Sequence, residues 1–206
     1  MRLYLIRHGE TIGNSEKRFQ GKKDYELSLS GQKQAEQIAD RLKNLEIDYL
    51  YSSTLNRAVN TAEIINKHHS LTIIRREALD EYCWGVIEGY NREEIHRDFP
   101  RLGAKMEKDF FSASIPGEEG LNNFFSRLKI FENHLRAMAT KTDNVTVTIV
   151  THGRVIGGLT ALLSGYDFFS TPWPFVFSNA SLTELEFWQK YSKFRLRALN
   201  DLCHLR

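Results

Sequence analysis

Residues 1–11 read MRLYLIRHGET, an apolar run that ends abruptly in arginine, histidine and glycine. Residues 145–153, VTVTIVTHG, repeat the pattern, with a β-branched run followed by His152 and a glycine. Runs that are continuously apolar or β-branched are typical of strands buried on both faces of a parallel sheet. The two stretches therefore predict two strands of an α/β fold, and each strand ends in a histidine.

The segments between these strands predict an alternation of helices and short strands. Ser30 and Thr54 are expected to cap two helices, whose apolar residues recur at helical spacing as far as residues 45 and 65. Residues 48–52 and 71–74 are expected to form short strands. Residues 182–187 and 194–197 alternate between apolar and polar side chains, which predicts an antiparallel hairpin at one edge of the sheet.

The rest of the chain completes the predicted architecture. From residue 88 to about 140 the pattern is helical, which predicts a helical insertion that caps the sheet. The length of 206 residues suits one domain over residues 1–206, and no Pro- or Gly-rich linker divides it. We therefore predict a three-layer α/β/α sandwich whose sheet is mostly parallel with an antiparallel edge.

Composition narrows the classes of partner. Lys and Arg number 28 against 26 Asp and Glu, so the net charge of +2 gives no overall field that would attract a nucleic acid. The two cysteines, Cys83 and Cys203, fit neither a disulfide framework nor a metal motif, which favours a reducing compartment. We find no basic leader followed by an apolar segment and no run of membrane-spanning length. We therefore expect a cytoplasmic protein that binds neither membrane nor nucleic acid.

The two histidines predict a ligand site at one edge of the sheet. His8 and His152 follow parallel strands, and α/β folds bind ligands at the carboxyl ends of such strands. Arg57 lies in the first turn of a predicted helix, and Arg7 precedes His8. Two guanidinium groups, two imidazoles and a helix N-terminus suit a tetrahedral dianion such as a phosphoryl group. Taken singly, each histidine could instead be structural and Arg57 a surface residue, and the remaining histidines lack metal-ligand spacing.

The sequence resembles the histidine phosphatase superfamily, which has the phosphoglycerate mutase-like fold. The resemblance covers nearly the whole chain and rests on five motifs in the family's order. They are RHGET at 7–11 with Asn14, DYELS at 24–28 with Gly31 and Ala35, SSTLNRA at 52–58 with Thr61 and Ala62, LDE at 79–81 with Gly85 and Glu88-Gly89, and THG at 151–153.

The resemblance implies a mechanism and a set of site residues. His8 would be the nucleophile and would form a phosphohistidine, with its other ring nitrogen held by a backbone carbonyl. Arg7, Arg57 and His152 would bind the phosphoryl oxygens, with Asn14 as a further donor. Glu81 would protonate the leaving group and later activate water. No metal or other cofactor is expected, because the arginines take the metal's electrostatic role.

The resemblance leaves the exact activity open. The short chain favours a phosphomonoester hydrolase of small phosphorylated metabolites, similar to broad-specificity and α-ribazole phosphatases, over a phosphoglycerate mutase or a non-catalytic phosphate-ester binding module. Gly21, Lys22, Lys23 and Arg154 lie at the expected rim, where the charged side chains either contact a second anionic group on the substrate or are simply solvated.

Two further segments carry weaker expectations. Residues 116–120, PGEEG, resemble a Pro-Gly-Gly-Glu-Ser segment of the family, and Glu119 is expected to set the insertion against the site. The aromatic segment 166–177 is expected to pack in the core or loops, with a homodimer contact as the alternative.

Overall fold

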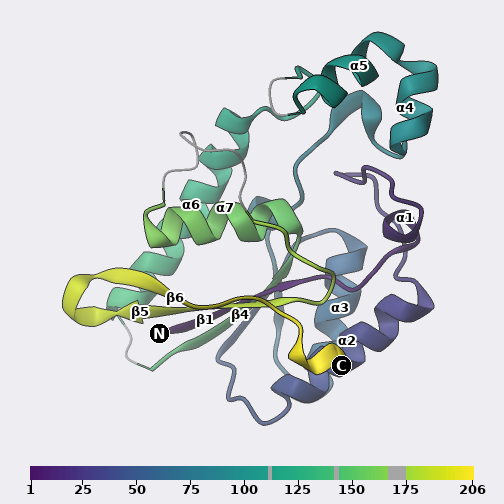
Figure 1. The fold of residues 1–206 in the computed structure, drawn as a ribbon. Coiled ribbons are helices and arrows are strands. Elements are labelled where there is room, and N and C mark those ends of the chain that lie inside the picture. Colours follow the sequence, from purple (N-terminus) through teal and green to yellow (C-terminus); the bar gives the residue numbers. More distant parts are fainter. Residues whose placement is uncertain (111–112, 142–143, 167–174) are drawn as a thin grey trace.

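The computed structural model describes residues 1–110, 113–141, 144–166 and 175–206, and its strands form one mixed sheet (Figure 1). The strand order is β3-β2-β4-β1-β5-β6. The strands are β1 (Arg2–Arg7), β2 (Tyr49–Ser52), β3 (Ile73–Arg75), β4 (Thr146–Thr151), β5 (Leu182–Trp188) and β6 (Lys193–Asp201). Strands β1 to β4 pair in parallel, while β5 and β6 are antiparallel. The predicted α/β class, mostly parallel sheet and antiparallel edge are confirmed.

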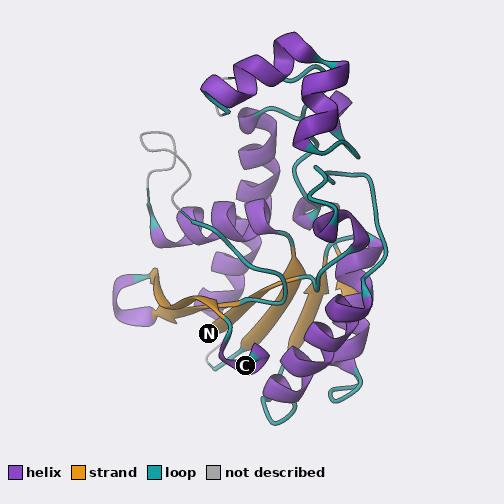
Figure 2. Cartoon of the chain, turned by 45° about the vertical axis from the view of Figure 1, so that its right-hand side comes forward, coloured by secondary structure: helices purple, strands orange, loops and turns teal. Residues whose placement is uncertain are grey.

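Helices cover both faces of this sheet (Figure 2). Helices α2 (Leu29–Leu42) and α3 (Asn56–Asn66) pack on one face, and α6 (Leu121–Lys141) and α7 (Gly153–Ser164) pack on the other. Successive side chains of β1 point to opposite faces, so Leu3 and Leu5 enter the α6–α7 core while Tyr4 and Ile6 enter the α2–α3 core. The continuous apolar run of β1 thus serves two cores, as a central strand of a three-layer sandwich requires.

Two predicted helix caps are wrong, each for a local reason. Ser28, not Ser30, caps α2, and its hydroxyl accepts the backbone N–H of Gly31 at 3.0 Å. Helix α3 begins at Asn56 after Leu55 and has no side-chain cap. The Thr54 hydroxyl donates to Asp80 instead, because the chain brings that carboxylate beside it.

The predicted helical insertion consists of two parts. Helices α4 (Arg92–Asp98) and α5 (Pro100–Lys108) stand beyond the sheet (Figure 1) and have an apolar cluster of their own that includes Ile95 and Met106. Helix α6 lies on the sheet itself, since Phe124, Leu128 and Leu135 are fully buried in its core. Most of the aromatic segment 166–177 lies outside the described residues.

The shorter elements complete the described chain. Helix α1 (Ile12–Ser15) follows the RHGET motif, and 3-10 turns occur at η1 (Glu77–Leu79), η2 (Gly85–Ile87), η3 (Gln189–Tyr191) and η4 (Cys203–Leu205). None of the described helices is both long and apolar enough to cross a membrane.

Strand register brings the two histidine motifs together. Arg7 of β1 lies opposite Thr151 of β4, and the backbone N–H of His8 donates to the carbonyl of Thr151 at 2.9 Å. His8 and His152 therefore leave the sheet at adjacent positions on its carboxyl edge.

Candidate active site

His8 is held in one tautomer by the backbone carbonyl of the next residue, Gly9. Its side chain is 3% exposed, and Nδ1 lies 2.7 Å from the carbonyl oxygen of Gly9. A carbonyl can only accept, so Nδ1 carries the proton and Nε2 has a free lone pair. Burial, together with the charges of Arg57 and Arg7, holds the pKa of His8 well below its ordinary value. The imidazole is therefore neutral at physiological pH, as a nucleophile must be.

Gly9 makes this geometry possible through a close backbone approach. A Cβ at this position would lie 2.3 Å from the carbonyl oxygen of Gly31 at the start of α2. The backbone N–H of Gly9 also donates to the hydroxyl of Thr61 in α3. The glycine after His8 therefore lets α2 and α3 both pack against the turn that follows β1.

Arg57 is buried, and most of its guanidinium N–H groups donate hydrogen bonds within the protein. Its guanidinium group donates to His152 Nδ1 at 3.3 Å, to Asp24 Oδ1 at 3.0 Å and to the carbonyl oxygens of Lys23 and Gly21 at 3.2 and 2.7 Å. These four contacts leave one of its five N–H groups for a ligand.

Arg7 and Asn14 bring further donors to the same place. Arg7 donates through Nη1 to the carbonyl of Phe177, while its buried Nε has no hydrogen-bond partner among the described residues. The Oδ1 atom of Asn14 accepts from Thr11 and Asn179, which leaves the amide N–H groups of Asn14 for another acceptor. A buried, unpaired guanidinium N–H beside an unpaired amide is the donor set that an oxyanion requires.

These side chains surround a cavity of about 150 Å³. It is lined by Arg7, His8, Asn14, Arg18, Phe19, Gln20, Gly21, Arg57, Glu81 and Trp84. The predicted nucleophile, both predicted arginines, the predicted amide and the predicted acid thus share one cavity. His152 is fully buried behind it, and its ring centroid lies 5.1 Å from that of His8.

The predicted rim residues differ in position. Gly21 lines the cavity, whereas Lys22, Lys23 and Arg154 are not among its lining residues. Lys22 Nζ pairs with Asp80 Oδ2 at 2.9 Å. Lys23 Nζ lies 5.9 Å from the ring centroid of Tyr25. The guanidinium group of Arg154 lies over two aromatic rings, 4.6 Å from the centroid of Tyr82 and 4.3 Å from that of Trp84, which does line the cavity.

Sequence reasoning missed the structural role of Glu88, which connects two segments that line the cavity. The carboxylate of Glu88 accepts the backbone N–H groups of Lys22, Lys23 and Trp84, each at 2.9 Å. It thereby ties the loop that contains Gly21 to the segment that follows Glu81. The only signal was its place in the fourth family motif.

The segment that carries Glu81 is fastened from α6. Arg127 donates to the carbonyl oxygen of Ala78 and to that of Glu81 itself, and it pairs with Glu119. The backbone N–H of Glu119 donates to the carbonyl of Cys83 at 3.0 Å, and the backbone N–H of Cys83 donates to Glu119 Oε2 at 3.4 Å. This arrangement agrees with the expectation that Glu119 sets the helical region against the site.

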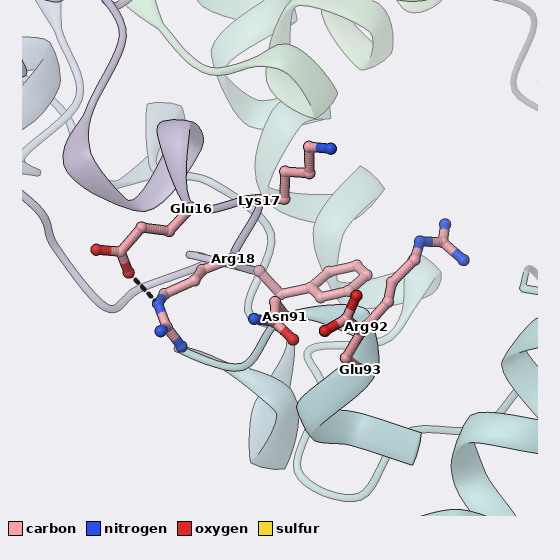
Figure 3. Close-up of a pocket in the computed structure, with 7 residues that line it drawn as sticks. Glu16, Lys17, Arg18, Asn91, Arg92 and Glu93 are labelled. Carbon is pink, nitrogen blue, oxygen red and sulfur yellow. Dashed lines mark hydrogen bonds and ion pairs between the residues drawn. The ribbon is translucent and has the colours of Figure 1, made fainter. Parts of the chain in front are cut away.

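A larger groove of about 470 Å³ adjoins the cavity and shares Arg18 and Phe19 with it (Figure 3). Its lining residues are Glu16, Lys17, Arg18, Phe19, Asn91, Arg92 and Glu93. Arg18 pairs there with Glu16 and with Glu94. In Figure 3 the side chain of Lys17 extends upward, while that of Arg92 extends upward and to the right and ends apart from it. Neither His8 nor His152 is among the residues that line this groove.

Within the described ranges, no group of three or more His, Cys, Asp or Glu side chains is arranged to hold a metal ion.

The fold and this cavity together define a phosphoryl-transfer protein of the α/β class. The chain belongs to the histidine phosphatase superfamily (branch 1), whose family model matches residues 3–202. The protein is accordingly a phosphatase, and the resemblance seen in the five sequence motifs is confirmed.

The relatives that carry a name include phosphatases and phosphoglycerate mutases. The chain is 30% identical over 205 residues to phosphoserine phosphatase 1 of Hydrogenobacter thermophilus, covering 100% of this chain and 94% of the relative. Among solved structures, it is similar to the α-ribazole phosphatase of Shigella flexneri, with a TM-score of 0.86, 26% identity and coverage of 98% and 96%. It is also similar to a phosphoglycerate mutase of Bacillus anthracis, with a TM-score of 0.83, 25% identity and coverage of 100% and 95%.

Proposed function

We propose that this phosphatase hydrolyses phosphate monoesters of small metabolites through a phosphohistidine formed on His8. The observation that carries the proposal is the 2.7 Å contact between His8 Nδ1 and the carbonyl of Gly9. It leaves the lone pair of Nε2 to attack phosphorus, in a cavity that also contains two arginines.

The arginines supply the electrostatic part of the reaction. Arg7, Arg57 and Asn14 would bind the non-bridging oxygens with the donors that the protein leaves unpaired. His152, which does not line the cavity, would act on the phosphate site by accepting a hydrogen bond from Arg57. A loose phosphoryl transition state needs positioning and charge stabilisation more than covalent help, so donors fixed in advance suit it.

Glu81 would supply the proton that the leaving alkoxide needs. It lines the cavity, and its Oε1 accepts the backbone N–H of Tyr82 at 2.9 Å, which fixes one side of the carboxyl group. After phosphoryl transfer the same carboxylate would take a proton from the attacking water.

The substrate class follows from the cavity and the relatives. A volume of about 150 Å³ holds a phosphoryl group and a small alcohol, and the adjoining groove offers room for more of the leaving group. Phosphoserine and α-ribazole phosphate, named in the relatives, are both small phosphorylated metabolites. Chain length does not separate phosphatase from mutase, since a phosphoglycerate mutase is matched over 95% of its length. Cys83 and Cys203 are free thiols, which suits a reducing compartment such as the cytoplasm.

Phosphate release and phosphoenzyme trapping test the proposal together. Purified protein is assayed against a panel of phosphorylated metabolites that includes 3-phosphoglycerate with a bisphosphate primer. The expected result is phosphate release from at least one monoester, with acid-labile, base-stable phosphate trapped on the wild type and absent from His8→Asn. Isomerisation without phosphate release would establish the mutase activity instead, and turnover by folded His8→Asn would refute the covalent mechanism.

A further inference from the structure

A chain of hydrogen bonds runs from the phosphate cavity to the protein surface. Arg57 Nε donates to His152 Nδ1, His152 Nε2 lies 2.8 Å from Ser53 Oγ, and Ser53 Oγ donates to Asp80 Oδ1 at 2.8 Å. Lys22 Nζ contacts the other carboxylate oxygen of Asp80 at 2.9 Å. His152 and Ser53 are fully buried, and Asp80 is 4% exposed.

The direction of each hydrogen bond follows from elementary donor rules. A guanidinium nitrogen can only donate, so His152 Nδ1 must accept and therefore carries no proton. Burial and the charge of Arg57 hold the pKa of His152 well below its ordinary value, so the ring is neutral and its single proton is on Nε2. Nε2–H then donates to Ser53.

Ser53 is saturated by its neighbours. Its oxygen accepts from His152 and from the backbone N–H of Leu55 at 3.1 Å, which uses both lone pairs, and its one proton goes to Asp80. Asp80 in turn accepts from the backbone and side chain of Thr54. Burial raises the pKa of Asp80, but these hydrogen bonds and that from Lys22 outweigh it and leave the carboxyl ionised.

We propose that Asp80 and Ser53 are positioning residues of the phosphate site, which hold His152 in its Nε2–H tautomer so that Nδ1 receives and orients Arg57. In this arrangement Lys22 is the charge partner of Asp80. The inference rests on the proposed function only in taking the cavity as the phosphate site. Its core, the tautomer of His152, is independent of turnover.

The tautomer is measured directly in the wild-type protein. With ¹⁵N-labelled histidine, long-range ¹H–¹⁵N correlation spectra distinguish a protonated Nε2 from a protonated Nδ1, and His152→Asn identifies the signals. The expected spectrum shows Nε2 protonated and Nδ1 bare. A protonated Nδ1 in the ligand-free wild type would overturn the proposal without any variant having to fold.

Variants then test whether the tautomer of His152 affects phosphate binding in the cavity. In Asp80→Ala the Ser53 hydroxyl is free to donate to Nε2, which favours the Nδ1–H form that cannot accept from Arg57. We expect a detectable Nδ1–H signal and an inhibition constant for inorganic phosphate raised about 10-fold, the effect of losing one hydrogen bond to a charged group. Ser53→Ala, which removes the acceptor of Nε2–H, should weaken phosphate binding to a similar degree, and the double variant should add little.

The controls separate this proposal from the proposed function. Asp98→Ala removes an exposed carboxylate of α4 that pairs with Arg97, and it should change neither the tautomer nor phosphate inhibition. Weaker phosphate inhibition in Asp80→Ala with an unchanged tautomer would overturn the positioning role. Failure of the wild type to bind phosphate or to turn over any monoester would count against the proposed function, while the spectrum would still decide the tautomer.

Discussion

Replacing His8 with asparagine should make the folded protein less sensitive to acid. In the folded chain, burial, Arg57 and Arg7 hold the pKa of His8 well below 6.5, the ordinary value to which it returns on unfolding. Below pH 6.5 the unfolded state therefore binds a proton at His8 that the folded state does not, and the free energy of unfolding falls as the pH falls. The loss is about 1.4 kcal/mol per pH unit until the pH reaches the folded pKa.

His152 makes the prediction quantitative, because its pKa is lowered in the same direction by burial and by Arg57. The two histidines together should cost the wild type twice the single-residue amount for each pH unit, and His8→Asn should remove one of the two shares. Above about pH 7 both imidazoles are neutral in both states, so the two proteins should show the same pH dependence there.

Urea unfolding at a series of pH values between about 5.5 and 7.5 measures these slopes, above the range where most carboxylates titrate. Asn133→Ala, which replaces an exposed residue of α6 that does not titrate, is the control for the substitution itself and should retain the wild-type slope. Parallel stability curves for the wild type and His8→Asn would refute the reasoning, because they would mean that His8 is not kept neutral by the fold.

Three further predictions concern catalysis. Glu81→Gln should slow phosphorylation of His8 by alkyl phosphates by roughly 10²–10⁴-fold but largely spare that step with nitrophenyl phosphate, whose leaving group needs no proton. Rapid mixing should therefore show a burst of nitrophenolate. An equal loss of rate with both substrates and no burst would exclude Glu81 as the acid. EDTA should leave activity intact because arginines supply the positive charge, and a loss restored by one divalent ion would contradict this. Alanine at Arg154 or Lys23 should raise KM for a dianionic metabolite more than for an aryl phosphate, by about 1 kcal/mol or less. Lys22→Ala should instead raise KM for both substrates equally, because Lys22 pairs with Asp80. If Lys22→Ala raised KM mainly for the dianionic metabolite and the other two variants did not, the second anionic group would be assigned to Lys22.

The fold and the centre of the site could be predicted because their signals are local. The continuous apolar runs of β1 and β4 identify buried parallel strands, and such strands end at one edge of the sheet. Placing His8 and His152 together required only that rule. Arg57 followed from its position in the first turn of the helix after β2.

The hydrogen-bond partners could not be predicted in the same way. Asp80 reaches Ser53 and Thr54 only because η1 returns the chain past the end of β2, which no spacing reveals. The same carboxylate draws the Thr54 hydroxyl away from the helix start, so the predicted cap of α3 failed. Lys22 looked like a rim cation because its buried partner was invisible in the sequence.

The position of β1 also has a consequence for how the protein is made. This strand comes first in the sequence, yet its neighbours β4 and β5 begin only at residues 146 and 182. At a synthesis rate of about 5–20 residues per second, its apolar side chains wait on the order of ten seconds for a partner strand. We therefore expect the nascent chain to remain a chaperone client until β4 and β5 have been synthesised, and the active site to form only after His152, which follows β4, has emerged.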